Sequence, residues 1–347
     1  MTLPDVLIVN AGSTSVKLTR RRGGVDVAPP SSLDEALADP APPAVVVHRV
    51  VHGGTRTQPE VLDDDAVRAL RELTDLAPLH QPPALDAIDR LRAAWPGATQ
   101  VACFDTAFHT SMPVAARTYA LPARLRERVQ VYGFHGLSHA WATSRVHDVA
   151  PGARRVLVAH LGGGQSLCGV LDGRSQVTTM GFTPLDGLVM ATRSGTIDPG
   201  AVLYLARHGD ELDDLDTAFE REGGLLGLSG SGDMRDVLAR RRSGDPDAEL
   251  AVGVWLHRLV RQAGGVVGVL EGLDALVFTA GIGENSHTVR RLVAERLGWL
   301  GVGIDDDLRA APDDLAEITA PGARVRTFVV HAREDRQMIA EAAALLA

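Results

Sequence analysis

The chain has 347 residues, of which 45% are hydrophobic and 23% charged, and this composition argues against a disordered, collagen-like or coiled-coil protein. The length predicts two domains or one large one. A formal net charge of −9 argues against a general nucleic-acid-binding or anionic-membrane-binding surface. Two cysteines are too few for a disulfide framework, and the sequence has neither an apolar run of 18 residues nor a signal-like N-terminal segment. We therefore expect a soluble, cytoplasmic protein.

Strand and helix patterns alternate along the chain, which predicts an α/β fold. In the first half we expect strands at 6–9, 16–19, 45–47 and 100–104, and helices at 60–76, 84–94 and 137–148. In the second half we expect strands at 156–160, 167–171, 275–279 and 325–330, and helices at 199–207, 245–272, 286–298 and 334–346. A strand, a glycine-containing turn and a second strand open each half, which suggests a duplicated fold.

Several segments combine glycine with hydroxyl, amide or charged side chains, namely 10–17, 160–166 and 229–235. Such segments suit a phosphate chain and its Mg²⁺. The first contains Lys17, the only lysine of the chain. A fourth segment, Gly281–Ser286, follows an expected strand but lacks the third glycine of the dinucleotide fingerprint. A nucleotide phosphate or adenosine against its amides is therefore favoured over a dinucleotide, with a plain tight turn as the alternative.

Polar residues that can act on a phosphoryl group lie at expected strand ends or beside glycines: Arg49, Asp105, His135 and Arg193. Guanidinium groups match carboxylates and phosphates through paired hydrogen bonds. The alternatives are surface ion pairs for the arginines, a core histidine for His135 and a helix cap for Asp105. The HExxH zinc spacing and the GxSxG nucleophile elbow are both absent from the sequence. The residues alone thus indicate an α/β phosphoryl-transfer or nucleotide-binding protein.

Ten segments together resemble the acetate kinase (acetate/propionate kinase) family, and they occur in the family's order over residues 3–300: VLIVNAGSTSVK, HRVVHGG, LAPLHQPP, FDTAFHTSMP, YGFHGLSH, HLGGGQS, MGFTPLDGL, ATRSGTIDP, GDMRD and FTAGIGENS. The resemblance implies two similar ribonuclease H-like domains of the sugar kinase/actin type flanking a central cleft. Residues 1–148 would form the acyl-substrate and magnesium domain, with helix 334–347 packing back on it, and residues 149–333 the nucleotide domain.

The activity implied by the resemblance is reversible phosphoryl transfer between ATP and acetate, giving ADP and acetyl phosphate. It implies Mg²⁺ as cofactor, with Mn²⁺ as an alternative, acetate or propionate as substrate, and a homodimer. A carboxylate substrate is already ionised at pH 7, so no general base is needed to create the nucleophile. We therefore expect Asp105 to orient the metal or an arginine, with proton transfer as a lesser role.

Site residues follow from the resemblance position by position. The catalytic residues would be Asp105, His135, Arg193 and Arg49, and the metal-site residues Asn10 and Glu334, with Asp335 in reserve. The acyl substrate would contact Arg49, Val51, Leu79, Phe134 and Pro184. ATP would contact Lys17, His160, Leu161, Gly162, Gly163, Gly164, Asp233, Met234, Arg235, Gly281, Ile282, Gly283, Glu284 and Asn285.

The sequence also departs from the family pattern. Gly163 stands where the family usually has asparagine in HLGNG, and Thr196 replaces the first acid of GDIDP. The chain is shorter than the family between its first strands and HRVVHGG. A propionate-preferring kinase, a kinase with another phosphoryl donor such as pyrophosphate, and a nucleotide-binding regulatory homologue that has lost turnover therefore stay open as alternatives.

Overall fold

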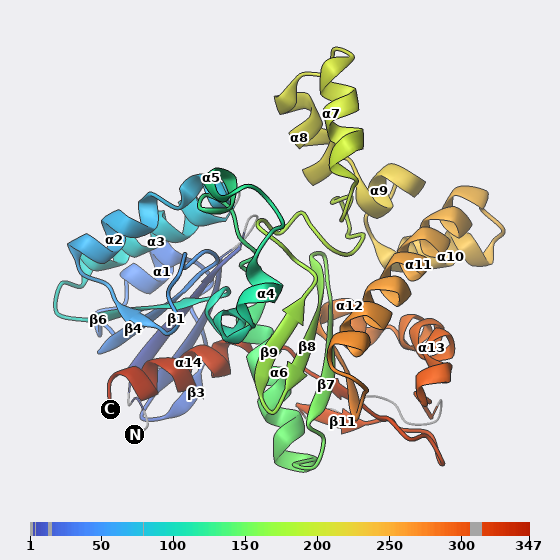
Figure 1. Cartoon of the computed structure of the whole chain (residues 1–347). Coiled ribbons are helices and arrows are strands. Elements are labelled where there is room, and N and C mark those ends of the chain that lie inside the picture. The colour runs from blue at the N-terminus through green and yellow to red at the C-terminus, as the bar shows by residue number, and fades with distance from the viewer. Residues whose placement is uncertain (1–2, 4, 13–15, 79, 306–313) are drawn as a thin grey trace. The chain divides into compact units, whose positions relative to one another are not determined.

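The computed structural model describes residues 3, 5–12, 16–78, 80–305 and 314–347. The chain divides into two compact units. Unit 1 comprises Met1–Thr110, Phe134–Trp141 and Arg333–Ala347, and unit 2 comprises Ser111–Gly133 and Ala142–Ala332. Each unit is built around one six-stranded mixed sheet (Figure 1).

Unit 1 contains the first six strands, the helices between them and the C-terminal helix. The strands are β1 (Asp5–Ala11), β2 (Val16–Arg22), β3 (Val25–Val27), β4 (Val45–Val50), β5 (Glu60–Val61) and β6 (Thr99–Phe104). The helices are α1 (Leu33–Leu37), α2 (Asp64–Arg71), η1 (Thr74–Leu76), α3 (Gln81–Ala94) and α14 (Glu334–Leu345). Two elements begin in unit 1 and continue into unit 2, namely η2 (Ala107–Ser111) and α6 (Gly136–Val149).

Unit 2 contains the other six strands and most of the helices. The strands are β7 (Arg155–Leu161), β8 (Gln165–Leu171), β9 (Arg174–Thr178), β10 (Ala275–Thr279), β11 (Leu315–Glu317) and β12 (Arg326–Val330). The helices are α4 (Val114–Arg117), α5 (Ala123–Arg126), α7 (Pro199–Arg207), α8 (Leu212–Glu220), α9 (Gly224–Ser229), α10 (Met234–Arg242), α11 (Pro246–Val269), α12 (Ala280–Asn285), α13 (His287–Arg296) and η3 (Gly298–Leu300). Among the described residues, no helix is both long enough and apolar enough to cross a membrane.

The two sheets have the same topology. The strand order is β3-β2-β1-β4-β6-β5 in unit 1 and β9-β8-β7-β10-β12-β11, read from the other edge, in unit 2. In each sheet three strands form an antiparallel meander, β1-β2-β3 or β7-β8-β9. The first strand of the meander pairs in parallel with a fourth strand, β4 or β10, which pairs in parallel with a fifth, β6 or β12. An antiparallel edge strand, β5 or β11, completes each sheet. The duplication suggested by the strand–turn–strand openings is therefore present as a repeated sheet topology.

Helix α14 lies across one face of the unit 1 sheet (Figure 1). Because side chains alternate between the faces of a strand, every second residue of β1, β4 and β6 faces this helix. The resulting apolar cluster consists of Val6, Ile8, Val45, Val47, Val101, Cys103, Leu137, Met338, Ile339 and Ala342, together with Leu3. The opposite face packs against α1, α2 and α3.

The helix expected at 60–76 begins too early and is not continuous: α2 covers Asp64–Arg71, and the 3-10 helix η1 covers Thr74–Leu76. Glu60 and Val61 form the edge strand β5 instead, and they pair with Ala102 and Val101 of β6. Asp63 then caps α2, because its side chain accepts a hydrogen bond of 2.8 Å from the Ala66 N–H. The segment 281–285, for which a tight turn was an alternative, belongs to the short helix α12.

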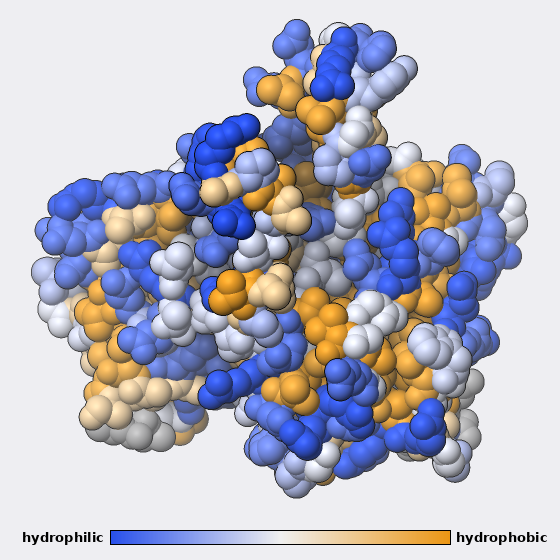
Figure 2. Space-filling view, viewed as in Figure 1, coloured by the Kyte–Doolittle hydropathy of each residue, from blue (hydrophilic) through white to orange (hydrophobic). Residues whose placement is uncertain are grey.

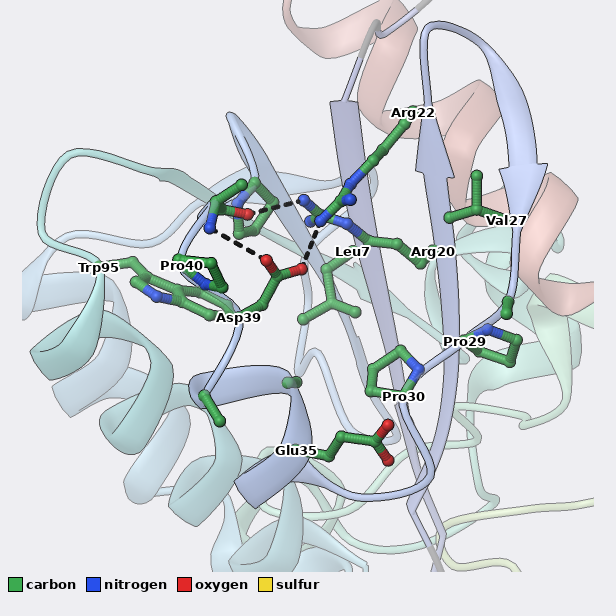
Figure 3. Close-up of a pocket in the computed structure, with 15 residues that line it drawn as sticks. Leu7, Arg20, Arg22, Val27, Pro29, Pro30, Glu35, Asp39, Pro40 and Trp95 are labelled. Carbon is green, nitrogen blue, oxygen red and sulfur yellow. Dashed lines mark hydrogen bonds and ion pairs between the residues drawn. The ribbon is translucent and has the colours of Figure 1, made fainter.

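A cavity of about 600 Å³ lies on the α1 side of unit 1 and contains none of the predicted site residues (Figure 3). Its wall includes the proline-rich connection before β4, together with Leu7, Val27 and Trp95. Arg20 pairs with Asp5 at 2.9 Å, and Arg22 pairs with Asp39. The guanidinium groups at this cavity are therefore balanced by carboxylates of the same unit.

Candidate active site

Three neighbouring strands of unit 1 end in polar residues on the face that α14 covers. Asn10 continues the row of Val6 and Ile8 in β1, and Arg49 continues the row of Val45 and Val47 in β4. Asn10 is the register partner of Arg49 in the parallel pair. Asp105 directly follows β6. The carboxyl ends of parallel strands are where ligands bind in open α/β sheets, so this edge of unit 1 is the candidate acyl site.

Arg49 is the centre of this polar cluster. Its Nε donates to Asp105 Oδ1 at 2.9 Å and its Nη2 to Asp105 Oδ2 at 2.6 Å, and its Nη1 donates to Asn10 Oδ1 at 3.0 Å. Glu334, the first residue of α14, lies 3.5 Å from Nη1 and accepts a hydrogen bond of 2.8 Å from Asn10 Nδ2. We call these four residues the Arg49 cluster; the tertiary fold brings them together from positions up to 324 residues apart.

Burial shapes the electrostatics of the Arg49 cluster. The Arg49 side chain is 14% exposed and that of Asp105 is 1% exposed. Burial alone would lower the pKa of Arg49, but the charges of Asp105 and Glu334 outweigh it and raise that pKa above its ordinary value. Arg49 therefore stays a fixed positive charge, as a binder of carboxylate or phosphate must.

The Arg49 cluster also contains the oxygen donors that a magnesium ion prefers. Glu334 offers a carboxylate and Asn10 an amide oxygen, and Mg²⁺ is commonly held by one or two carboxylates together with substrate phosphates. Among the described residues, no group of three or more His, Cys, Asp and Glu residues is arranged to hold a metal by itself. The carboxylate of Glu334 and the amide oxygen of Asn10 are nevertheless of the chemical type that could hold Mg²⁺.

His135 lies next to the Arg49 cluster because a backbone hydrogen bond joins the following residue, Gly136, to Asp105. The His135 φ of 57° is in the left-handed region, which is uncommon for a residue other than glycine. The next residue, Gly136, donates its N–H to the Asp105 carbonyl oxygen at 2.9 Å. A Cβ at position 136 would collide with that oxygen, so only glycine allows the approach. The YGFHG segment is thereby held against the backbone of Asp105.

Two of the residues expected around the alkyl group of the substrate are buried in unit 1. Val51 is 3% exposed and Phe134 1% exposed, and the Phe134 ring packs edge-on against His52 at 5.6 Å. His109 lies at 2.9 Å from the Phe134 carbonyl oxygen through Nε2. Pro184 belongs to unit 2, and Leu79 lies outside the described residues.

In unit 2, three of the glycine-containing segments line one cavity of about 580 Å³, a size typical of small-molecule sites. The predicted residues on its wall are Gly162, Gly163, Asp233, Met234, Arg235, Gly281, Ile282 and Asn285. Asp233 also caps α10, since its carboxylate accepts a hydrogen bond of 2.9 Å from the Arg235 N–H. Gly232 and Ser286 complete the wall. The structure therefore brings segments near 162, 233 and 282 together.

The other predicted ATP residues lie elsewhere. Lys17 is an exposed residue of β2 in unit 1, where it is the register partner of Asn10. The Leu161 side chain is fully buried in the unit 2 core. The remaining residues belong to unit 2 but not to the cavity wall, namely His160, Gly164, Gly283 and Glu284.

Arg193 is held by a carboxylate that the sequence analysis did not single out. Its Nε lies 3.0 Å from Glu220 Oε2 at the end of α8, and its Nη1 lies 3.4 Å from the Pro184 carbonyl oxygen. Burial raises the pKa of Glu220, and the charge of Arg193 acts against that rise. Nothing in the local sequence separates Glu220 from the other acids of α8, so only the fold identifies it.

Thr196, which stands in place of an acid of the family pattern, has a local structural role. Its hydroxyl donates to Asp186 Oδ1 at 2.6 Å and accepts from the Gly187 N–H at 3.1 Å. A carboxylate at position 196 would face Asp186 directly. Threonine at this position therefore suits the aspartate present in this chain.

Residues 31–341 match the acetokinase family. This chain belongs to that family. Its relatives include the acetate kinase of Clavibacter sepedonicus, 40% identical over 97% of this chain and 98% of that protein. The acetate kinase of Rhodopseudomonas palustris strain TIE-1 is 46% identical over 84% of this chain and 74% of that protein. The family resemblance found in the motifs is thus confirmed.

Solved structures of the acetokinase family have the same fold. The acetate kinase of Porphyromonas gingivalis superposes with a TM-score of 0.87 at 27% identity, covering 99% of this chain and all of that one. A propionate kinase of Francisella tularensis superposes with a TM-score of 0.85 at 31% identity, over 97% of this chain and 98% of the other. The expected fold class, two similar ribonuclease H-like units of the sugar kinase/actin type, is confirmed. The alignment with the Clavibacter sepedonicus protein spans 386 positions, more than the 347 residues of this chain, so that relative contains residues that this acetokinase lacks.

Proposed function

We propose that this protein is an ATP-dependent kinase of short-chain carboxylates, with acetate as the first substrate and propionate as the second. The reaction is ATP + acetate giving ADP and acetyl phosphate, and it is reversible. Family membership supports the activity, and named relatives include acetate kinases and a propionate kinase. The observation that carries the proposal is the Arg49 cluster, a partly buried guanidinium held by two carboxylates and an amide at the strand ends of unit 1.

The Arg49 cluster would receive the carboxylate substrate. Arg49 binds the anion, and Asp105 holds the guanidinium in one orientation through two parallel hydrogen bonds. Val51 and Phe134 would contact the alkyl group of the substrate. Because both side chains are apolar, we expect an apolar alkyl group there. Transfer of a phosphoryl group to an ionised carboxylate requires positioning and charge stabilisation, with no proton to remove from the nucleophile. His135 and Arg193 are proposed to supply further donors to the moving phosphoryl group.

The cavity of unit 2 would bind ATP. Gly162, Gly163 and Gly281 leave backbone close to the cavity, so an adenosine and its phosphates can approach without side-chain obstruction. Asn10 and Glu334 would hold the magnesium ion. When bound, that ion supplies positive charge that offsets the developing charge on the phosphate oxygens.

We also propose a homodimer that acts in the cytoplasm. In unit 2, α7 and α8 stand away from the sheet, and their surface includes apolar side chains (Figures 1 and 2). None of the nine residues of α7 is buried, although Leu203 and Tyr204 are among them. Leu212, at the start of α8, is 70% exposed. A second copy of the chain is the proposed occupant of this apolar surface, since such patches mark association sites.

A hydroxamate assay tests the proposed reaction. The protein is incubated with MgATP, hydroxylamine and acetate, propionate or butyrate, and acyl hydroxamate is measured by its colour with ferric ion. We expect product with acetate and propionate. A parallel arm with pyrophosphate in place of ATP is expected to give none, because the unit 2 cavity has room for adenosine. Product only with pyrophosphate, or ATP binding with no hydroxamate from any acid, would contradict the proposal.

A further inference from the structure

Glu284 belongs to the GIGEN segment, yet it does not line the unit 2 cavity. Its carboxylate contacts residues 331 and 332 of the same unit instead. Oε1 accepts a hydrogen bond of 2.8 Å from the Ala332 N–H, and Oε2 lies 3.1 Å from His331 Nδ1. The Glu284 side chain is only 12% exposed. Both carboxylate oxygens of Glu284 thus contact residues 331 and 332, which follow β12.

The helix that carries Glu284 is also the helix that faces the nucleotide cavity. Gly281, Ile282 and Asn285 of α12 line that cavity, while Gly283 and Glu284 do not. The buried guanidinium of Arg290 binds the end of this helix: its Nη1 donates to the carbonyl oxygens of Gly283 at 2.9 Å and Glu284 at 2.6 Å. Glu284 and the cavity-lining residues Gly281, Ile282 and Asn285 thus belong to one short helix, Ala280–Asn285.

His331 and Ala332, which Glu284 contacts, lie just before Glu334, the residue proposed to hold the magnesium ion. Ala332 is the last residue of unit 2, and the chain then returns to unit 1 at Arg333. Glu334 follows, with its Oε2 accepting from Asn10 Nδ2 at 2.8 Å. Two residues span at most about 7 Å even when fully extended. The position of Ala332 therefore limits where Glu334 can lie.

We propose that Glu284 is a positioning residue that couples occupancy of the nucleotide cavity to the placement of Glu334. The inference deepens the proposed function and rests on it. The family resemblance would assign Glu284 to ATP contact. The geometry gives it another task, because its carboxylate binds the strap of residues 331–332. Nucleotide binding then stabilises α12, the strap and the start of α14 as one connected element.

Hydrogen exchange measures this link without turnover. In the unmodified protein, saturating ADP without metal is expected to slow amide exchange in peptides covering residues 331–334 by tenfold or more. Glu284→Ala removes the acceptor of the Ala332 N–H, so this slowing is expected to be lost, while the Kd for ADP changes by less than about threefold. Unchanged slowing in Glu284→Ala would overturn the proposal. So would a large rise in the Kd for ADP with exchange unaltered, since that result indicates a direct nucleotide contact.

Two further variants sharpen the test. Glu284→Gln keeps an oxygen for the Ala332 N–H and is expected to retain most of the slowing; equal loss in both variants would contradict the hydrogen bond as the link. Glu295→Ala removes an exposed carboxylate that pairs with Arg291 on α13 and is expected to behave as the unmodified protein. Circular dichroism confirms that each variant is folded.

Kinetics provide a second readout. Glu284→Ala is expected to lower kcat by tenfold or more and to raise the magnesium concentration needed for half-maximal rate, with the KM for ATP nearly unchanged. A rise in the KM for ATP alone would overturn the proposal. If the unmodified protein forms no acyl phosphate from any carboxylate, the proposed function fails, but the ADP-dependent exchange at residues 331–334 still tests the coupling separately.

Discussion

Arg49 holds Asp105 through two parallel hydrogen bonds, from Nε to Oδ1 at 2.9 Å and from Nη2 to Oδ2 at 2.6 Å. The pair joins the ends of two parallel strands, β4 and β6, at the sheet edge that Glu334 also reaches. Such a bidentate pair fixes the plane of the guanidinium and so the direction of its remaining donors. Asp105 is therefore expected to act by orienting Arg49.

Asp105→Asn tests this role. Asparagine keeps the shape of the side chain but loses the charge and one of the two acceptors, so Arg49 loses its orientation. We expect kcat to fall by about 100-fold or more, as when an oriented transition-state donor is lost, while the KM for acetate changes little. Steady-state kinetics with acetate and MgATP measure both. Near-normal turnover would remove Asp105 from the mechanism.

The control for Asp105→Asn is a carboxylate in an exposed pair of the same unit. Asp89 pairs with Arg71 on the surface, and Asp89→Asn is expected to leave kcat unchanged. Breaking a buried ion pair costs about 3–5 kcal/mol of stability in other proteins, so the Tm of Asp105→Asn is measured alongside. Glu334 remains near Arg49 in that variant, which limits the loss.

Glu220→Gln tests the positioning of Arg193. The variant replaces an ion pair of 3.0 Å by a neutral contact, and a hydrogen bond to a charged group is worth about 1.5–3 kcal/mol. We expect kcat/KM for the carboxylate to fall by about tenfold or more. Burial raises the pKa of Glu220, so the wild-type carboxylate protonates at a higher pH than an ordinary glutamate. The difference between wild type and variant should therefore narrow as the pH is lowered.

The neighbouring Glu222 is the matched control for Glu220. It is exposed, and Glu222→Gln is expected to leave kcat/KM and its pH profile unchanged. Equal effects of the two substitutions would mean that the charge of the segment matters and the pair with Arg193 does not.

Gly163→Asn tests the departure from HLGNG. Gly163 lies on the wall of the nucleotide cavity, and a Cβ there would meet nothing within 4 Å, so asparagine can be accommodated. One added hydrogen bond is worth about 0.5–1.5 kcal/mol, which corresponds to a KM for ATP lower by about two- to tenfold. Gly152→Asn, at another open glycine, is the control. An unchanged or higher KM in Gly163→Asn would show that the amide makes no contact with the nucleotide.

Three buried histidines predict the pH dependence of stability. Burial lowers the pKa of His48, His52 and His109 to about 4, so the folded protein resists protonating them. The unfolded chain protonates histidine near pH 6.5, and it therefore binds more protons between about pH 6.5 and 4. The free energy of unfolding should fall as the pH drops through this window, by up to about 1.4 kcal/mol per pH unit for each histidine.

Urea unfolding between pH 7 and pH 5 measures this slope. His48→Gln is expected to reduce the slope of the free energy of unfolding against pH by the contribution of one histidine. Substitution of the exposed His147 by Gln is expected to leave the slope unchanged. A wild-type stability that is constant over this range would contradict the neutral, buried state of these histidines.

Leu203→Glu tests the proposed association surface on α7. Leu203 is 52% exposed, so the substitution adds charge without disturbing a core. If α7 contacts a second copy, the charge weakens the homodimer, and light scattering coupled to size exclusion should show monomer. Val114→Glu changes another exposed apolar residue of unit 2 and is expected to leave the mass unchanged. A dimer that survives Leu203→Glu would place the interface elsewhere.

The sequence by itself determined the fold class and much of the candidate site. Continuous apolar runs, such as those at 6–9 and 45–47, predicted the central strands, because a strand covered on both faces buries consecutive residues. The glycine-rich segments could be identified because they combine glycine with polar side chains. Arg49 and Asp105 could be identified because they are charged residues at the ends of apolar strands. The start of the helix expected at 60–76 was wrong, because the pairing of residues 60–61 with β6 is a tertiary contact.

Only the tertiary structure decided which charges act together. Glu220 looks like an ordinary surface acid in the sequence, yet it pairs with Arg193. Glu284 was expected to contact ATP, yet its carboxylate accepts a hydrogen bond from the Ala332 N–H. Glu334 reaches Asn10 across 324 residues of chain. Hydrophobic periodicity carries information about burial along one element, whereas the partner of a charge depends on which elements pack together. For that reason the ion pairs and polar hydrogen bonds of both units are determined by the tertiary structure.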